Sequence, residues 1–406
     1  MSVSIWEGNK AQELLDLLTA QNHLLSHQNA AIDLLASDKR SELASNLEEI
    51  AELVYADELL EMMDYGDKIT LLWNKGGTEY SAPMNLCHIE TAELEDGESI
   101  RVADVEWEYL IPDGIPFSPA QAIYESDTDL AAGTYYFTVA NDSWGGNNGK
   151  NIQFTLATTL PAGYQIRKSV GYNALVTSGT LDIYSSGAVA TGSANKLYSV
   201  TPTEGNTGTF LGTSNGTGDI NHWHRVALGH NRWSTSFARK YLNATGEKAT
   251  WWTKTEKWEV KASVADTLDG FLYGYDENFL DYFQITKIQT AVNTIEGGGT
   301  DITYDRVFLA SLEQMYCVPQ VSGIEGDYWG YYKRLLGRTT PAPTNATYAR
   351  FKKYGIENKS SAQYYWRRSA YRSNATSEWI VSTSGTVYDG GAGYSYRLAP
   401  CLRIGR

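Results

Sequence analysis

YYWRRSAYRSNATSEWIVSTSGTVYDGGAGYSYRLAPCLRIGR, residues 364–406, carries the strongest structural signal in this chain. Residues 379–383 alternate as in a strand, Ser384 and Gly385 follow as a turn, and residues 386–388 begin a returning strand. Such alternation around a short Gly-containing turn is typical of a β-hairpin. The sequence therefore predicts C-terminal strands held by an apolar set of residues. This set comprises Trp366, Trp379, Val381, Val387, Leu398, Cys401, Leu402 and Ile404.

A Gly-rich stretch, residues 389–396, separates the hairpin from the last predicted strand. It is rich in Gly, Ser and Tyr, which antibody binding sites also use, because Tyr gives a large rigid contact while Ser and Gly adapt. An ordinary surface loop has a similar composition. Composition alone leaves a binding surface and a plain connecting loop both open.

Several separated segments carry motifs of a known family. They are residues 365–369, 379–387 and 396–402, which follow the order W-x-R-S, G-x-V and R-x-A, and the upstream residues 231–243 and 304–312. Together, residues 165–406 resemble C-type-lectin-like domains, related to formylglycine-generating enzymes, of a bacterial and phage family. That family includes the variable proteins of diversity-generating retroelements.

The resemblance implies a binding function. In that family, mutagenesis of template adenines scatters substitutions over chosen codons, and the variable positions lie on the ligand-facing surface. The variable region here would be about residues 364–406, with the matching positions Tyr371, Ser373, Thr376, Ser377, Glu378, Tyr388, Asp389, Gly390, Gly391, Gly393, Tyr394 and Tyr396. The resemblance thus predicts a phage receptor-binding protein, in a tail or head fibre, that binds a bacterial surface protein or glycan.

The charge distribution disfavours nucleic acid as a partner. The net charge of the 406 residues is −15, but residues 321–406 hold thirteen Lys or Arg and five Asp or Glu, a net +8, which leaves −23 for residues 1–320. An acidic body repels phosphate backbones, whereas the positive C-terminal part suits an anionic ligand such as an acidic glycan. The balance of 42% hydrophobic and 20% charged residues is globular, and the length predicts two or three domains.

Three cysteines, Cys87, Cys317 and Cys401, lie far apart and show no C-x-x-C spacing. The sequence therefore predicts buried thiols, and neither a disulfide framework nor a zinc site. No signal-peptide pattern and no apolar run of membrane-spanning length occurs. We expect synthesis in a host cytoplasm, no membrane insertion and a final location in the virion.

The N-terminal region shows helical periodicity over residues 10–63. Two apolar seams have steps of three and four residues, and their register changes around residues 37–40. The first seam contains Leu14, Leu18, Leu25 and Ile32, and the second contains Leu43, Leu47, Ile50 and Val54. We predict a helical stalk, residues 1–64, that forms a homotrimer and attaches to other virion proteins. An intramolecular helical hairpin remains the alternative.

From Asp67 the period changes to two, which predicts a β-rich middle domain, residues 65–164, before the C-type-lectin-like domain, residues 165–406. The expected fold class is therefore α+β. Two sets of polar residues are candidate metal ligands. The Asn/Asp-rich residues 141–149 suit calcium, and His222, His224 and His230 suit a transition metal. A hairpin turn and ordinary packing explain them with fewer assumptions, so we expect no metal and no cofactor.

Two other functions compete with receptor binding. An oxidase-type enzyme of the formylglycine-generating fold needs a cysteine pair or a histidine set, and no such local pattern surrounds Cys317 or Cys401. No Ser/His/Asp order, paired-carboxylate motif or phosphate loop occurs either, so we expect no enzyme. A host-encoded surface adhesin shares the binding chemistry, and the missing signal peptide argues against it.

Overall fold

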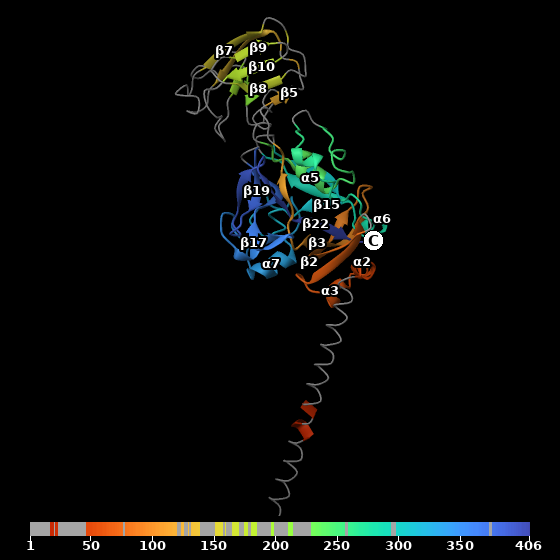
Figure 1. The fold of residues 1–406 in the computed structure, drawn as a ribbon. Helices are drawn as coiled ribbons and strands as arrows, with labels where there is room; N and C mark the ends of the chain where they lie inside the picture. Colours follow the sequence, from red (N-terminus) through yellow and green to blue (C-terminus); the bar gives the residue numbers. More distant parts are fainter. Residues whose placement is uncertain are drawn as a thin grey trace, which may run out of the picture.

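A computed structural model of the chain shows helices and sheets together, which confirms the α+β class (Figure 1). It describes residues 17–19, 21–22, 46–75, 78–119 and 229–406, the last without 256–258, 294–297 and 373–375, and separate stretches between 123 and 213. Residues 17–19 and 21–22 are helical, and the rest of the expected stalk before residue 46 lies outside the described residues. Within the described part, no helix is long and apolar enough to cross a membrane.

The first five-stranded sheet joins residues from both ends of the chain. Its order is β1 (Lys68–Lys75), β2 (Thr78–Glu93), β3 (Ser99–Trp107), β22 (Pro400–Ile404) and β15 (Val307–Leu309). Strand β22 runs antiparallel to β3, with Cys401 opposite Glu106 and Ile404 opposite Ala103. The last residues of the chain therefore complete a sheet that begins near residue 68.

The second five-stranded sheet contains the C-terminal hairpin. Its order is β20 (Val387–Gly391), β19 (Ser377–Val381), β18 (Tyr365–Ala370), β21 (Ser395–Leu398) and β4 (Ile111–Pro116). Val381 lies opposite Val387, and Gly385 has a φ of 87°, a left-handed value that favours glycine at the turn. The hairpin prediction is confirmed, and the expected apolar set is buried in both sheets.

Two smaller sheets and three short helices complete the described domain. The sheets are β13 (Thr286–Ala291) with β14 (Thr300–Asp305), and β16 (Lys353–Gly355) with β17 (Asn358–Gln363). The helices are α5 (Phe237–Leu242), α6 (Glu277–Leu280) and α7 (Gly330–Leu336). The Ser236 side chain accepts from Arg239 N and caps α5.

Residues 120–228 form an insertion that leaves and re-enters this domain at one place. Ser118 N donates to Ala392 O at 3.0 Å, and a Cβ on Gly229 would lie 2.4 Å from Ser118 O. The described strands of the insertion form two four-stranded sheets. One has the order β5 (Ile123–Glu125), β8 (Gln165–Ser169), β10 (Thr180–Tyr184), β9 (Ala174–Thr177), and the other β12 (Phe210–Thr213), β11 (Lys196–Tyr198), β6 (Gly133–Thr138), β7 (Asn151–Leu156).

The sheets correct the expected division into residues 65–164 and 165–406. Strands β1 to β4 share sheets with β15 and β18 to β22, so residues 68–116 belong to the same folded unit as residues 229–406. The expected boundary at residue 164 falls inside the insertion instead. Local periodicity indicated the strands but carried no information on their long-range pairing.

The end of the expected stalk is also part of this unit. Helix α2 (Leu47–Tyr55), capped by Asn46, packs beside β3 and β22, and helix α3 (Leu59–Met62) packs against α2. Ile50, Val54 and Leu59 are fully buried. The described part of the second apolar seam, residues 47–54, therefore covers a sheet, and the stalk boundary expected at residue 64 is wrong.

A charged cluster is buried between the two large sheets. Glu106 of β3 accepts from Arg367 of β18 at 2.7 Å and from the Tyr332 hydroxyl of α7 at 2.5 Å, and Lys353 Nζ lies 3.1 Å from the same carboxylate. Glu106 and Arg367 are both fully buried. Burial raises the pKa of Glu106, but the charges of Lys353 and Arg367 outweigh it and hold the pKa below its ordinary value.

Part of the positive charge expected on the C-terminal surface is buried or paired, whereas other cations such as Lys333 and Lys359 are exposed. Arg367 pairs with Glu106, Arg403 with Asp104 at 2.9 Å, and Arg397 with Glu357 at 2.5 Å. The carboxylates of β2 and β3 thus neutralise Arg367 and Arg403, which the sequence counts toward a positive C-terminal module.

We predict different outcomes for two N-terminal truncations. Deletion of residues 1–45 leaves the folded unit stable, whereas deletion of residues 1–64 removes Ile50, Val54 and Leu59 from the core. Each such loss costs about 2–5 kcal/mol, and their sum is comparable with the whole stability of a domain. Thermal unfolding of the two truncated chains measures the difference. Equal melting temperatures would contradict the packing of α2.

We also predict that either partner of the buried pair is essential. Glu106→Gln leaves the buried cations Arg367 and Lys353 without their shared carboxylate, so it lowers the free energy of unfolding by about 3–5 kcal/mol. Arg367→Met removes one of the two cations that balance Glu106, so it also lowers the free energy of unfolding, but by less, because Lys353 stays paired with Glu106. The matched control is Glu52→Gln, which breaks the exposed pair with Arg406 and costs less than about 1 kcal/mol. Urea denaturation measures all three. Small losses at Glu106 and Arg367 would refute the role of this pair.

Candidate functional site

Four tyrosines gather on the second sheet and are here called the tyrosine patch: Tyr364, Tyr388, Tyr394 and Tyr396. The rings of Tyr364 and Tyr396 stack with centroids 5.1 Å apart, and Tyr394 meets Tyr396 edge-on at 6.1 Å. Tyr394 is 61% exposed, while the other three are half-buried. Burial, and then a hydrogen bond with Tyr364, raise the pKa of Tyr388 to about 12, so its hydroxyl stays neutral at physiological pH.

Strand pairing brings the patch together. Tyr388 on β20 lies opposite Ile380 on β19, which lies opposite Trp366 on β18, so these three side chains share one face of the sheet. Trp366 is fully buried and packs against the ring of Tyr396 at 4.8 Å. The buried ring of Trp366 therefore supports the tyrosine patch, whose outer side is in contact with solvent.

Glycines beside the patch are constrained by close packing. A Cβ on Gly390 would lie 2.9 Å from Ile380 Cδ1, and a Cβ on Gly391 would lie 3.4 Å from the Tyr394 ring. Substitution at Gly390 therefore requires Ile380 to move. A Cβ on Gly229 would lie 2.7 Å from Gly393 N, so the return point of the insertion touches the same loop.

The twelve predicted display positions fall into different environments. Tyr394 is exposed, and Tyr371, Tyr388, Asp389, Gly390, Gly391, Gly393 and Tyr396 are partly buried. Ser373 lies outside the described residues. Thr376, Ser377 and Glu378 are buried, with Glu378 fully so, which corrects the expectation that they are displayed.

Hydrogen bonds of Asn231 hold the loop before β19, and these bonds are here called the loop clamp. The Asn231 amide donates to Ser377 O at 2.6 Å and to Tyr371 O at 3.1 Å, and its Oδ1 accepts from Asn293 at 2.9 Å. Thr376 O accepts from Ala392 N at 2.8 Å. These bonds fix both ends of the loop relative to the tyrosine patch.

The upstream motif segments support this clamp. Trp233 Nε1 and Arg239 Nε both donate to Asp305, at 2.9 and 2.7 Å, and Arg232 makes two bonds to Asp301 at 2.6 and 2.7 Å. The segments around residues 231–243 and 304–312 are therefore in direct contact, although more than sixty residues separate them in the sequence.

Glu378 is a buried carboxylate inside β19. Its Oε1 accepts from Trp379 N at 3.0 Å, and its Oε2 has no hydrogen-bond partner among the residues that the structure describes. Burial raises the pKa of Glu378 well above its ordinary value. Folding therefore favours the protonated carboxyl group.

The other candidates from the sequence lie apart from the patch. Cys87, Cys317 and Cys401 are buried free thiols, as predicted. His230 is buried beside the clamp, whereas His222, His224 and residues 141–149 fall outside the described residues.

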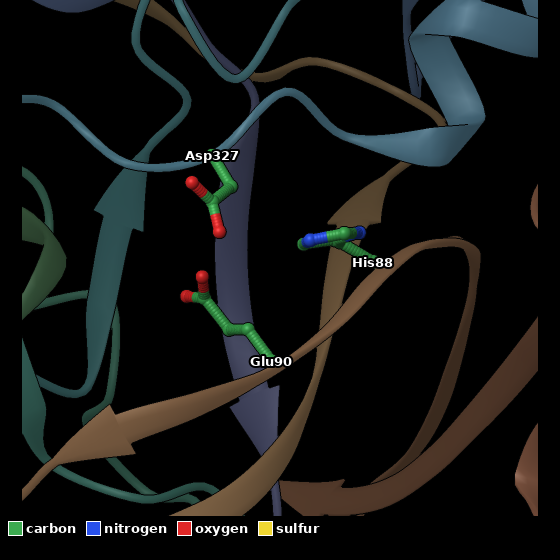
Figure 2. A group of neighbouring side chains, drawn as sticks. All are labelled: His88, Glu90 and Asp327. Carbon is green, nitrogen blue, oxygen red and sulfur yellow. The ribbon is translucent and has the colours of Figure 1, made fainter. Parts of the chain in front are cut away.

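Two features of the site escaped the sequence analysis. Tyr364 belongs to the patch, and its alternation with Trp366 along one strand face is the signal that indicates it. His88, Glu90 and Asp327 lie close together on the first sheet (Figure 2). The His-x-Glu spacing on a strand was visible in the sequence, but the approach of Asp327 was not.

Comparison with known proteins gives one match. Residues 206–405 match a family model described as a domain of unknown function, DUF6273. No curated protein and no solved structure matches the chain. The matched residues include the tyrosine patch, the loop clamp and every C-terminal motif segment, and the description assigns them no activity.

We predict that Glu378→Gln stabilises the protein at pH 7. The unfolded state ionises Glu378 at its ordinary pKa, whereas the folded state resists ionisation, so the wild-type chain loses stability as pH rises above that ordinary value. The amide removes this penalty, which we expect to be about 1 kcal/mol or more.

The pH profile of urea denaturation checks this prediction. The advantage of Glu378→Gln should shrink as pH falls toward the ordinary glutamate pKa, where both forms are protonated or neutral. Destabilisation by Glu378→Gln at pH 7 would contradict the raised pKa of Glu378.

Proposed function

We propose that this protein is a binding protein whose tyrosine patch and neighbouring loops contact a ligand on a bacterial surface. The observation that carries this proposal is a set of adjacent tyrosines on a rigid sheet, with Tyr394 61% exposed. Tyrosine gives large contact area at low entropic cost, and tyrosines are enriched among the residues that dominate binding energy.

The surroundings of the patch favour a ligand recognised by shape and neutral contacts. Arg367 and Arg403 pair with buried carboxylates, and the hydroxyl of Tyr388 in the patch stays neutral. We therefore propose a protein or neutral glycan ligand rather than the acidic glycan that the sequence charge favours. Aromatic faces and hydroxyl edges suit both ligand classes.

We further propose, from the motif resemblance, that the chain is a retroelement-diversified phage receptor-binding protein located in the virion. Variation would then concentrate at the expected positions whose side chains reach the surface, among them Tyr371, Tyr388, Asp389 and Tyr394. Thr376, Ser377 and Glu378 are buried, so substitutions there would change the conformation of the loop before β19 without contacting a ligand directly. An adenine-substituted near-copy of the codons for residues 364–406, beside a reverse transcriptase gene, would support this origin.

The N-terminal region would assemble the protein into an oligomer. The first apolar seam, over residues 14–32, would form a homotrimer that holds several patches together and attaches them to other virion proteins. Linking weak sites raises their combined affinity through effective concentration. Light scattering of the full chain and of a chain lacking residues 1–45 tests this, since only the full chain should be trimeric.

Alanine substitutions separate binding from folding. Tyr394→Ala should leave the free energy of unfolding within about 0.5 kcal/mol, because the side chain is mostly exposed. If Tyr394 lies at the centre of the contact, its loss should weaken binding by about 2 kcal/mol, roughly thirtyfold. The measurement is labelling of intact bacteria by the fluorescent full-length chain, on a strain that the wild-type chain labels, together with a melting curve.

Two control substitutions separate a loss of binding from a loss of folding. Tyr55→Ala removes a tyrosine that is 75% exposed on α2, away from the second sheet, and should change neither readout. Trp379→Ala removes a ring that is 2% exposed and should lower the melting temperature. Tyr396→Ala is unsuitable, because this ring packs on Trp366. Unchanged labelling by both Tyr388→Ala and Tyr394→Ala would refute the tyrosine patch as the binding surface.

A further inference from the structure

Three potential metal ligands converge on one face of the first sheet. His88 and Glu90 are two residues apart on β2, so their side chains point to the same face, and Asp327 reaches them from the segment before α7. One possible ligand atom from each residue lies within 4.8 Å of the other two. Figure 2 shows the two carboxylates facing each other, with an edge of the His88 ring beside them.

The cluster holds more negative than positive charge. Arg403 donates to both Glu90 and Asp104, so one guanidinium serves two carboxylates. Asp327 makes no hydrogen bond or ion pair to any residue that the structure describes. Three carboxyl groups therefore lie near one guanidinium, which leaves the cluster short of positive charge.

Neighbouring arginines do not remove this excess. Arg101 donates to Asp57 at 2.6 Å, and Arg368 donates to Gln289 O at 2.9 Å and lies near the charge of Glu325. Both guanidinium groups are thus engaged elsewhere. Two facing carboxylates without a cation between them repel each other, which leaves the ligand set favourable for an ion.

We propose that His88, Glu90 and Asp327 bind one divalent cation of the zinc class, with water at the remaining position. One imidazole nitrogen and two carboxylate oxygens are donors that zinc accepts in tetrahedral sites. Calcium instead takes six to eight oxygens, and magnesium keeps oxygen ligands in an octahedron, so neither suits an imidazole.

Binding of a zinc ion requires the three ligand atoms of His88, Glu90 and Asp327 to move closer together. Ligand atoms about 2.0–2.1 Å from a tetrahedral zinc ion are about 3.3 Å from each other. The ligand atoms now lie within 4.8 Å of one another, so the distances between them have to decrease on binding. Asp327 can make this movement because its side chain is exposed. Glu90, which is held by Arg403, would stay in place.

A polar cavity of about 210 Å³ adjoins the cluster and shares Glu90 with it. Gln314 also lines this cavity, its side chain is fully buried, and its Nε2 has no hydrogen-bond partner within the described part of the chain. Buried polar groups are nearly always hydrogen-bonded. The unpaired amide thus provides a donor for a polar molecule in the space next to the ion.

A bound ion would connect the segment before α7 to β2. Asp327 lies two residues before Trp329, which is fully buried, and five before Tyr332, which donates to Glu106. The ion would therefore act as a crosslink that positions α7 over the first sheet. An ion that binds only the folded chain raises its melting temperature.

The test uses the full-length chain, freed of metal with a chelator and dialysed into chelator-free buffer. Titration calorimetry with zinc chloride should give one site per chain, and zinc should raise the melting temperature. Asp327→Asn and His88→Gln should each weaken zinc affinity at least tenfold and abolish the thermal shift. The matched control is Glu95→Gln, an exposed carboxylate outside the cluster, which should bind zinc as the wild type does.

Three outcomes would overturn the proposal. The first is the absence of zinc binding by wild-type protein at pH 7.5. The second is binding that Asp327→Asn and His88→Gln leave unchanged, which would place the ion elsewhere. The third is saturation by calcium without competition from zinc, which would exclude the imidazole as a ligand. Circular dichroism of both variants before titration ensures that each is folded, and Asp327→Asn changes only an exposed side chain.

Discussion

The buried contact between Glu106 and Arg367 is the constraint on which both large sheets depend. Glu106 belongs to the first sheet and Arg367 to the second, and Tyr332 and Lys353 bring α7 and β16 to the same carboxylate. Desolvating these charges is unfavourable unless all of them are paired, so the cluster tolerates only one relative placement of its elements. The cluster around His88 lies on the first sheet and the tyrosine patch on the second, so this contact also links the two sites.

Sequence reasoning worked where the signal was local. The hairpin over residues 379–388 was predictable because alternation and Gly385 lie within ten residues of each other. The pairing of β3 with β22 was not, because no local pattern connects Ala103 with Ile404. The domain boundary and the end of the stalk were therefore wrong.

The display positions were partly wrong for a different reason. Every residue of β19, Ser377–Val381, is buried, so this strand has no solvent face. Alternation of polar and apolar residues is normally evidence for one exposed face. Here polar residues are buried on the second face instead, where the Asn231 clamp bonds their backbone, and Glu378 retains a carboxylate in the interior. The sequence pattern could not distinguish a solvent face from a polar interior face.

The insertion between Ser118 and Gly229 has a consequence for how this architecture can change over time. Its two ends meet beside Ala392, so the closed domain does not depend on how long the intervening chain is or how it folds. The entropic cost of closing a loop rises only slowly with its length. Segments of quite different size could thus be exchanged at this junction during evolution. Each exchange would bring a new module next to the tyrosine patch while the buried charges that define the fold stay unaltered.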